Sequence, residues 1–285
     1  TDGSAALIRR YPDPRIRRIE NEKNLGVTRS LNLGLERARG RYVARMDADD
    51  LCSPERLERE VAVLDAHPRV GLVATRARVI DASGAEIGII DTPSDGETLR
   101  RQLRRRNSIV HGSVLMRTEV VRALGGYDEA MEPAEDYDLW LRLSERHAIA
   151  ALPDLLYAWR EHDGGVGLRR LDQQRHAAER ARLAARRRFA SALVDEVTAG
   201  AVSADRAARR ALELLWEEKT AFPAASRAAA LARRVPRLYA LRNLGPLLRL
   251  RQTLAACAAG GCDADATCAA VLTWMVALER GRRSA

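Results

Sequence analysis

The alternation of strand and helix signals over the first 160 residues constrains the fold of this chain more than any other feature. Short apolar or β-rich runs predict strands at 15–20, 41–46, 70–80, 86–90, 109–116, 148–152 and 155–159. Between them, apolar residues at helical spacing and capping residues predict helices at 5–10, 27–38, 54–64, 95–106 and 136–146. This order of elements is typical of an α/β domain with a largely parallel sheet.

The second part of the chain has a different composition. From about residue 168 the strand signals end, and Ala, Leu and Arg dominate. The sequence predicts helices near 169–195, 203–219, 224–234, 238–257 and 264–281. We therefore divide the chain into an α/β domain over residues 1–167 and a helical region over residues 168–285.

The charge of the chain limits its partners. Lys and Arg number 48 against 39 Asp and Glu, a formal net charge of +9, which suits nucleic acid or an anionic membrane. Nucleic acid is not an expected partner, because no aromatic residues alternate with basic ones in a way that would stack bases. No stretch approaches the 18 apolar residues of a membrane span. Residues 235–251 mix Leu with Arg, which suits a helix lying on anionic lipid; the alternative is a helical bundle with its Arg in solvent.

Three carboxylates crowd the end of the strand predicted at 41–46. In an extended chain the side chains of Asp47 and Asp49 point the same way, and Asp50 follows them. Carboxylates this close raise each other's pKa unless a cation lies between them. Mg²⁺ or Mn²⁺ prefers oxygen ligands and often bridges to substrate phosphates. The cluster predicts a metal–diphosphate site at the end of a strand; the alternative is an acidic turn that caps the helix beginning near Pro54.

A second acidic group begins the helix predicted at 136–146. Asp136 lies where a loop becomes a helix, and a helix N-terminus favours a negative charge. Either Asp136 or Asp138 is a candidate general base beside a substrate. The alternative is structural, with Asp136 as an N-cap and Asp138 as an ordinary acid of the first turn.

Seven short motifs occur in a fixed order along residues 1–165. They are Asn24-Leu25-Gly26, Ala38-Arg39-Gly40-Arg41-Tyr42, Asp47-Ala48-Asp49-Asp50, His111-Gly112-Ser113, Gly125-Gly126-Tyr127-Asp128, Glu135-Asp136-Tyr137-Asp138-Leu139-Trp140 and Trp159-Arg160-Glu161-His162. Together they resemble family 2 glycosyltransferases, the group that builds bacterial surface polysaccharides. The resemblance implies a GT-A fold: a Rossmann-like mixed, mostly parallel sheet flanked by helices, here followed by an all-α C-terminal region.

The resemblance also implies roles for particular residues. In that family an Asp-x-Asp element holds a metal and the donor diphosphate, which points to Asp49 as the first metal ligand with Asp47 and Asp50 beside it. The Glu-Asp pair carries the catalytic base, which corresponds to Asp136 preceded by Glu135. A histidine just past the last core strand often completes the metal or diphosphate site and matches His162, although an exposed loop histidine is the alternative.

The remaining assignments concern the two substrates. By the same resemblance, Asp47, Asp2, Arg29 and Asn32 lie on the nucleotide side, and His111, Gly125, Gly126 and Asp138 lie near the acceptor. A solvated helix face is the alternative for Arg29 and Asn32, and a half-buried structural histidine is the alternative for His111. The family usually has an apolar strand before its Thr-Asp-Gly-Ser segment. Because the chain begins at Thr1, we expect it to be N-terminally truncated, lacking that first strand, and poorly stable as it stands.

The implied reaction is the metal-dependent transfer of one sugar from a nucleotide-diphosphate sugar to an acceptor hydroxyl, with inversion. The Gln-x-x-Arg-Trp element of processive members is absent from the sequence, which favours transfer of a single sugar. The acceptor would be a saccharide or a lipid-linked saccharide. The expected location is the cytoplasm, with peripheral contact at the inner face of the membrane through the helical region. The alternatives are a sugar-nucleotidyltransferase and a non-catalytic, transferase-like binding module.

Overall fold

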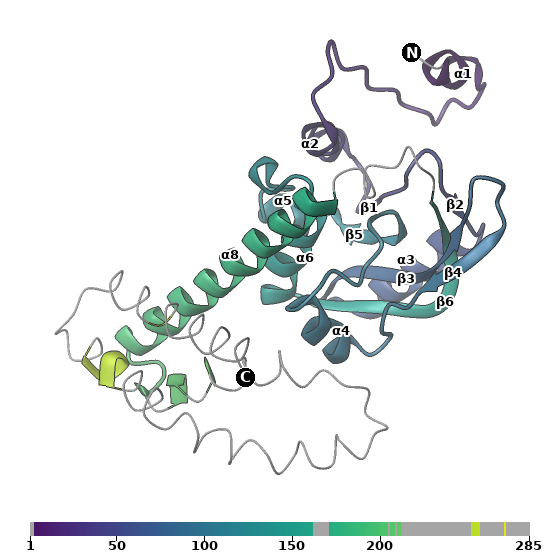
Figure 1. Ribbon diagram of the computed structural model, residues 1–285. Helices are drawn as coiled ribbons and strands as arrows, with labels where there is room; N and C mark the ends of the chain where they lie inside the picture. The colour runs from purple at the N-terminus through teal and green to yellow at the C-terminus, as the bar shows by residue number, and fades with distance from the viewer. Residues whose placement is uncertain are drawn as a thin grey trace.

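The computed structural model describes residues 3–161, 171–204, 206–208, 210–211, 252–256 and 271. Its centre is a curved sheet whose strands follow the order β1-β5-β3-β6-β2 (Figure 1). The remaining strand, β4, pairs with the same edge of β3 as β5, but farther along β3. The strands are β1 (Tyr42–Ala44), β2 (Leu51–Cys52), β3 (Val70–Ile80), β4 (Glu86–Ile90), β5 (Leu115–Arg117) and β6 (Ala148–Arg160).

Helices cover both faces of this sheet. The helices of the described residues are α1 (Ser4–Arg10), which stands apart from the sheet, α2 (Val27–Arg37), α3 (Arg56–Ala66), α4 (Gly96–Leu103), α5 (Thr118–Ala123), α6 (Glu135–Arg146) and α8 (Leu171–Thr198), with 3₁₀ turns η1 (His111–Ser113) and η2 (Glu129–Met131). None of the helices within the described ranges is long and apolar enough to cross a membrane. The predicted class, a mixed α/β fold with a helical C-terminal part, is confirmed.

The pairing of the strands differs from the expected, mostly parallel sheet. Among the described residues, β3 and β6 form a parallel pair, and the β1–β5, β3–β5, β3–β4 and β2–β6 pairs are antiparallel. The strand expected at 15–20 is irregular, and its Ile16 and Ile19 are exposed. These two residues are three apart, so they do not share one face of a strand. The two strands expected at 148–152 and 155–159 are one strand, β6, with an irregular register beside Pro153.

Two apolar clusters pack against opposite faces of the sheet. The larger joins Leu72 of β3 and Met116 of β5 to α4 and α6, with Trp140 of α6 fully buried in it. The smaller lies under α3 and includes Leu64 and Val73. The sheet is therefore the middle layer of the domain, and its strand ends carry the loops described below.

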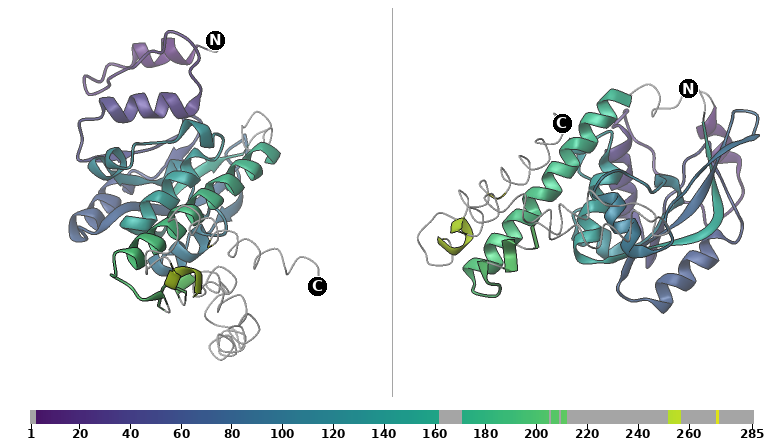
Figure 2. Two further views of the ribbon diagram at one scale, coloured as in Figure 1. Left: turned by 90° about the vertical axis from the view of Figure 1, so that its left-hand side faces the viewer. Right: turned by 60° about the horizontal axis from the view of Figure 1, so that its bottom comes forward.

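The long helix α8 belongs to two cores. Its first half packs on α6, where Ala177 and Ala181 are fully buried in the larger cluster (Figure 2). Its second half, with Leu193 and Val194, forms a separate apolar cluster with described residues between 202 and 271. Most of the helices predicted beyond residue 211 lie outside the described residues, so the division of the chain at residue 168 stays a prediction.

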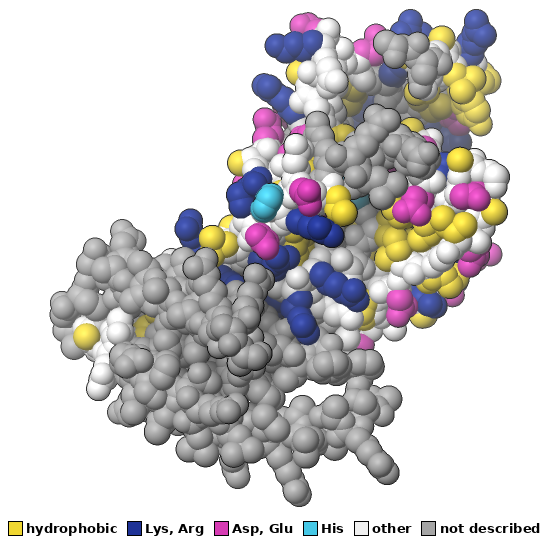
Figure 3. Space-filling view, in the orientation of Figure 1, with side chains coloured by type: hydrophobic (Ala, Val, Ile, Leu, Met, Phe, Trp, Pro, Cys, Tyr) yellow, Lys and Arg dark blue, Asp and Glu magenta, His cyan; other side chains and the backbone are white. Residues whose placement is uncertain are grey.

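The surface of the α/β domain is uneven. The helix α1 has no buried residue and stands away from the sheet at the top of Figure 1 and of the left view in Figure 2. On the side where β4 lies, hydrophobic side chains gather on the surface (Figure 3), and Ile87 and Ile89 are both exposed.

Candidate active site

The first acidic cluster forms a loop between β1 and β2. Asp50 is buried, and both of its carboxylate oxygens are used within the protein. The Tyr157 hydroxyl donates to Oδ2 at 2.5 Å, and the Arg160 backbone N–H donates to Oδ1 at 2.7 Å. Burial raises the pKa of Asp50, and these two hydrogen bonds oppose that rise. Asp50 therefore anchors the loop to β6.

The other two carboxylates of the loop lie in different surroundings. Asp47 forms an ion pair with Arg45, whose side chain is only 12% exposed. Asp49 is exposed, and its backbone carbonyl accepts a hydrogen bond of 2.8 Å from Nε of Arg160. The three carboxylates thus do not converge on one point. Within the described ranges, no group of three or more His, Cys, Asp or Glu residues is placed to hold a metal ion.

This donor set fits one mode of metal binding. Mg²⁺ commonly keeps only one or two protein carboxylates and takes its other ligands from water and substrate phosphates. Asp49, exposed on the loop, and Asp47, reachable if its ion pair opens, are suited to that mode. A cage made only of Asp47, Asp49 and Asp50 is not suited, because Asp50 is turned toward β6.

The second acidic cluster begins α6. Asn107 donates to Oδ2 of Asp136 at 2.8 Å, and the backbone N–H of Tyr137 donates to Oδ1 at 2.6 Å. Burial raises the pKa of Asp136, while these hydrogen bonds and the charge of Arg45 work against the rise. Asp136 is therefore oriented by two donors and holds a proton more readily than an exposed aspartate.

Glu135 lies directly before Asp136 and is more deeply buried. It is 7% exposed, and its Oε2 is buried without a hydrogen-bond partner in the described part of the chain. Burial, followed by the negative charge of Asp136, raises its pKa to about 7. The two adjacent carboxyl groups consequently differ in their surroundings, one oriented by hydrogen bonds and one desolvated.

His111 and Tyr127 lie beside this pair. Nε2 of His111 is 2.9 Å from the Tyr127 hydroxyl, and its ring centroid is 5.8 Å from that of Trp140 in an edge-to-face contact. Burial, and then the charge of Arg45, holds the pKa of His111 well below its usual range. His111 is therefore neutral at pH 7, so it can offer one ring nitrogen as a donor or an acceptor but adds no charge.

Arg45 was not among the residues that the sequence singled out. Its guanidinium pairs with Asp47, and its charge also acts on Asp136, Glu135 and His111. Arg45 is therefore near enough to both acidic clusters to act on each by its charge, although the chain separates the clusters by about 90 residues. The sequence held one signal for it: in an extended segment, the side chains of residues 45 and 47 share a face.

Three residues assigned to substrates by resemblance have structural contacts, and their substrate roles stay predictions. Asp138 is 1% exposed and pairs with Nε of Arg142 at 2.7 Å, on the side of α6 that faces α8. The side-chain amide of Asn32 makes two hydrogen bonds with the backbone of Tyr127. Its Nδ2 donates to the Tyr127 carbonyl at 2.8 Å, and its Oδ1 accepts from the Tyr127 N–H at 2.8 Å. Gly126 lies so close to the same amide that a Cβ on it would be 2.6 Å from Oδ1 of Asn32.

The contacts of the remaining assigned residues do not indicate a role in the site. Gly125 and Gly126 have φ of 82° and 72°, which fits a glycine turn after α5. Arg29 is exposed on α2. Asp2 and His162 lie outside the described residues. The roles proposed for all of these residues stay predictions.

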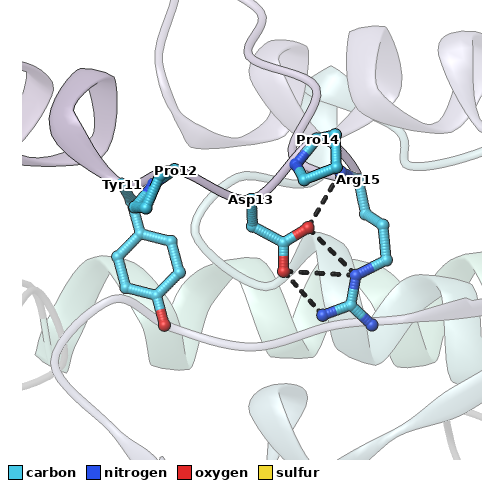
Figure 4. Close-up of a pocket in the computed structure, with 5 residues that line it drawn as sticks. All are labelled: Tyr11, Pro12, Asp13, Pro14 and Arg15. Carbon is cyan, nitrogen blue, oxygen red and sulfur yellow. Dashed lines mark hydrogen bonds and ion pairs between the residues drawn. The ribbon is translucent and has the colours of Figure 1, made fainter.

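A hollow on the N-terminal segment is separate from both acidic clusters. It is lined by five consecutive residues, Tyr11 to Arg15 (Figure 4). Asp13 in this segment accepts hydrogen bonds from the backbone N–H of Arg15 at 2.9 Å and from its Nη2 at 2.6 Å. Because one exposed stretch of chain forms the whole hollow, it contributes nothing to the candidate site.

The chain is similar to one protein family and to several known proteins. Residues 1–125 match the model of the family described as glycosyl transferase family 2. A mannosyltransferase from Pyrobaculum calidifontis, solved with GDP-Man and Mn²⁺, aligns with a TM-score of 0.45 and 21% identity, over 97% of this chain and 74% of its own. Residues 1–349 of S. aureus TarS align with a TM-score of 0.48 and 16% identity, over 99% of this chain and 80% of their own.

Curated relatives are more similar in sequence. The amylovoran biosynthesis glycosyltransferase AmsE of Erwinia amylovora is 38% identical over 150 residues, which are 52% of this chain and 56% of that protein. The putative glycosyltransferase EpsE of Bacillus subtilis is 37% identical over 150 residues, 51% of this chain and 53% of that protein. The chain spans about half the length of the curated relatives it matches. Residues 1–125 are thus similar to glycosyl transferase family 2, the family that the order of the motifs resembles.

Proposed function

We propose that this protein transfers a single sugar from a nucleotide-diphosphate sugar to an acceptor hydroxyl, with inversion and with Mg²⁺ or Mn²⁺. The observation that carries the proposal is the pair of acidic clusters, with Arg45 paired to Asp47 in the first and acting through its charge on Glu135 and Asp136 in the second. One cluster ends a strand, where open α/β sheets bind ligands, and the other begins a helix with an oriented carboxylate. Similarity to an amylovoran biosynthesis glycosyltransferase supports a role in cell-surface polysaccharide synthesis.

In this proposal Asp136 is the general base. Its Oδ1 and Oδ2 are fixed by Tyr137 and Asn107, so the carboxylate can face an acceptor hydroxyl in a constant orientation. As that hydroxyl loses its proton to Asp136, its oxygen bonds to the anomeric carbon and the bond from that carbon to the diphosphate breaks. General-base assistance of this kind typically contributes ~10²–10⁴ in rate.

The acidic loop would hold the donor. Asp49, with Asp47 beside it, would share a divalent ion with the donor phosphates, in the mode that the exposed carboxylates fit. When bound, this ion would offset the charge that develops on the departing nucleoside diphosphate. The guanidinium of Arg45 would supply positive charge to the same region from the protein itself.

The proposal names a class of acceptor and a location in the cell. The acceptor would be a saccharide or a lipid-linked saccharide on the cytoplasmic side of the membrane, with no role for nucleic acid. A peripheral contact with the membrane through the helical C-terminal region is part of the proposal. The Leu- and Arg-rich segment at 235–251 that motivates it lies outside the described residues.

The test measures release of nucleoside diphosphate from a panel of sugar nucleotides, with saccharide acceptors. Asp136→Asn should lower kcat by ~10²–10⁴ with little change in the donor KM. The matched control is Asp172→Asn, because the side chain of Asp172 is 87% exposed on α8. Turnover of Asp136→Asn within a few-fold of the unaltered protein would overturn the assignment. Release of inorganic diphosphate from a nucleoside triphosphate and a sugar phosphate would instead indicate a nucleotidyltransferase.

The metal part of the proposal has its own measurement. Asp49→Asn should abolish the gain in nucleoside diphosphate affinity that Mn²⁺ produces in calorimetry, while the thermal melt stays cooperative. Equal affinity of the unaltered protein with and without Mn²⁺ would contradict metal dependence and leave the loop as an acidic turn.

A further inference from the structure

One buried hydroxyl connects both ends of the first acidic loop. Tyr157 of β6 is 1% exposed, and its hydroxyl donates to Oδ2 of Asp50 at 2.5 Å. The same oxygen accepts a hydrogen bond of 3.3 Å from the backbone N–H of Asp47. A phenol has one donor and can accept as well, so this single group holds both ends of the turn that presents Asp49.

A second residue of β6 reinforces the same turn. The backbone N–H of Arg160 donates to Oδ1 of Asp50 at 2.7 Å, and its Nε donates to the carbonyl of Asp49 at 2.8 Å. The short strand β2 then continues the loop by pairing with β6, where Cys52 lies opposite Tyr157. The conformation of the acidic loop is therefore set by β6, more than 100 residues away in the chain.

The ring of Tyr157 is itself held in place. The guanidinium carbon of Arg56 lies 5.1 Å from the centre of the ring, a distance typical of a cation–π contact. Arg56 is 1% exposed, and its Nη2 donates to the carbonyls of Arg45 and Val114 at 3.1 Å each. Because Arg56 is fixed by these carbonyls, the ring has little freedom to move away from it.

The position of the hydroxyl also depends on a glycine. A Cβ on Gly112 would lie 1.8 Å from the Tyr157 hydroxyl oxygen and 2.2 Å from Cζ. Real atoms do not approach this closely, so any side chain at residue 112 would displace the ring. Gly112 is not among the glycines with positive φ, so alanine fits its backbone conformation, and the three atoms nearest to its Cβ would all belong to Tyr157.

We propose that Tyr157 is a positioning residue of the donor site, acting through Asp50 and the backbone of Asp47, and that residue 112 is glycine in order to admit its hydroxyl. The proposal rests on the proposed function in one respect, namely that the loop binds a nucleoside diphosphate. In this proposal β6 holds the loop through its hydrogen bonds to Asp50, and these contacts orient the carboxylate of Asp49 toward the ligand.

The first measurement is amide hydrogen exchange of the protein without ligand. Tyr157→Phe removes the hydroxyl and keeps the ring, so exchange in the segment 46–52 should rise at least tenfold. Gly112→Ala should do the same. Thr92→Val is the matched control, because Thr92 is also 1% exposed and its hydroxyl donates to the carbonyl of Ser108 at 2.9 Å. In that variant, exchange should rise near residues 92 and 108 and stay unchanged in 46–52.

The second measurement is calorimetric binding of GDP and of UDP with Mn²⁺. Tyr157→Phe and Gly112→Ala should each weaken the tighter of the two by tenfold or more, and the double variant should be no weaker than the worse single variant, because both remove one contact. Thr92→Val should bind like the unaltered protein.

The outcomes separate the two proposals. Unchanged exchange in 46–52 for both variants would show that the hydroxyl does not hold the loop, whatever the protein binds. Raised exchange with unchanged binding would show that the held loop does not position the donor. If the unaltered protein binds neither nucleotide but exchange responds, the proposed function fails and the positioning role fails with it, while the contact itself stands.

Discussion

Replacing Glu135 by glutamine should change the pH dependence of stability by an amount that the structure sets. Glu135 is 7% exposed, and its Oε2 has no partner among the described residues. Burial, and then the charge of Asp136, raises its pKa from 4.5 to about 7. Each unit of pKa corresponds to 1.36 kcal/mol, so ionising Glu135 in the folded protein costs about 3 kcal/mol.

The sign of the effect follows from proton binding. Between pH 4.5 and about 7 the folded protein keeps a proton on Glu135 that the unfolded chain has released. The folded state therefore binds more protons in this window, and the free energy of unfolding falls as the pH rises. Glutamine resembles the protonated acid in shape and cannot ionise. Glu135→Gln should match the unaltered protein at pH 4 and exceed it by about 3 kcal/mol at pH 8.

The assay is urea unfolding followed by tryptophan fluorescence at several pH values. Other carboxyl groups with raised pKa, such as Glu60 and Asp50, contribute equally to both proteins and cancel in the difference. Glu129→Gln is the control, because Glu129 is an exposed glutamate in the nearby turn η2. A stability difference that is the same at pH 4 and pH 8, or that favours glutamate at pH 8, would refute the reasoning.

Two further substitutions test positions that the resemblance assigned to the acceptor. Asp138→Asn removes the charge that pairs with Arg142, so urea unfolding should show a loss of about 2 kcal/mol while kcat stays within a few-fold; a large fall in kcat at unchanged stability would place Asp138 in the site. Gly126→Ala would place a side chain at φ of 72° with its Cβ 2.6 Å from Oδ1 of Asn32, so the free energy of unfolding should fall by about 2 kcal/mol. Gly34→Ala is the control, because no atom lies within 4 Å of its Cβ, and it should raise the free energy of unfolding by up to about 1 kcal/mol. Equal effects of the two substitutions would contradict this account.

Local signals in the sequence determined the elements and their order. Asp95 accepts a hydrogen bond of 2.9 Å from the N–H of Thr98 and begins α4, as a capping residue should. The hairpin of β3 and β4 forms around Asp81 and Gly84, where turn residues separate two β-rich runs. Asp136 lies in the first turn of α6. Each of these features depends on neighbours within a few residues, which periodicity and capping rules describe well.

The tertiary structure decided which partners surround each acidic side chain. Asp47, Asp49 and Asp50 are consecutive or nearly so, yet one pairs with Arg45, one is exposed, and one is buried against Tyr157. The partner that turns Asp50 inward is 107 residues away. Asp138 likewise points to α8 and not to Asp136, because the hydrophobic stripe of α6 fixes its rotation.

The sequence by itself determined the family resemblance, the mixed α/β class and the two acidic clusters, because each depends on short segments and on their order along the chain. Only the tertiary structure decided that most strand pairs are antiparallel, that the segment 15–20 is not a strand, and that the charge of Arg45 acts on both clusters. The physical reason is that pairing direction and electrostatic environment depend on which distant segments share a buried surface. A periodic pattern shows that a face is buried but not which residue covers it.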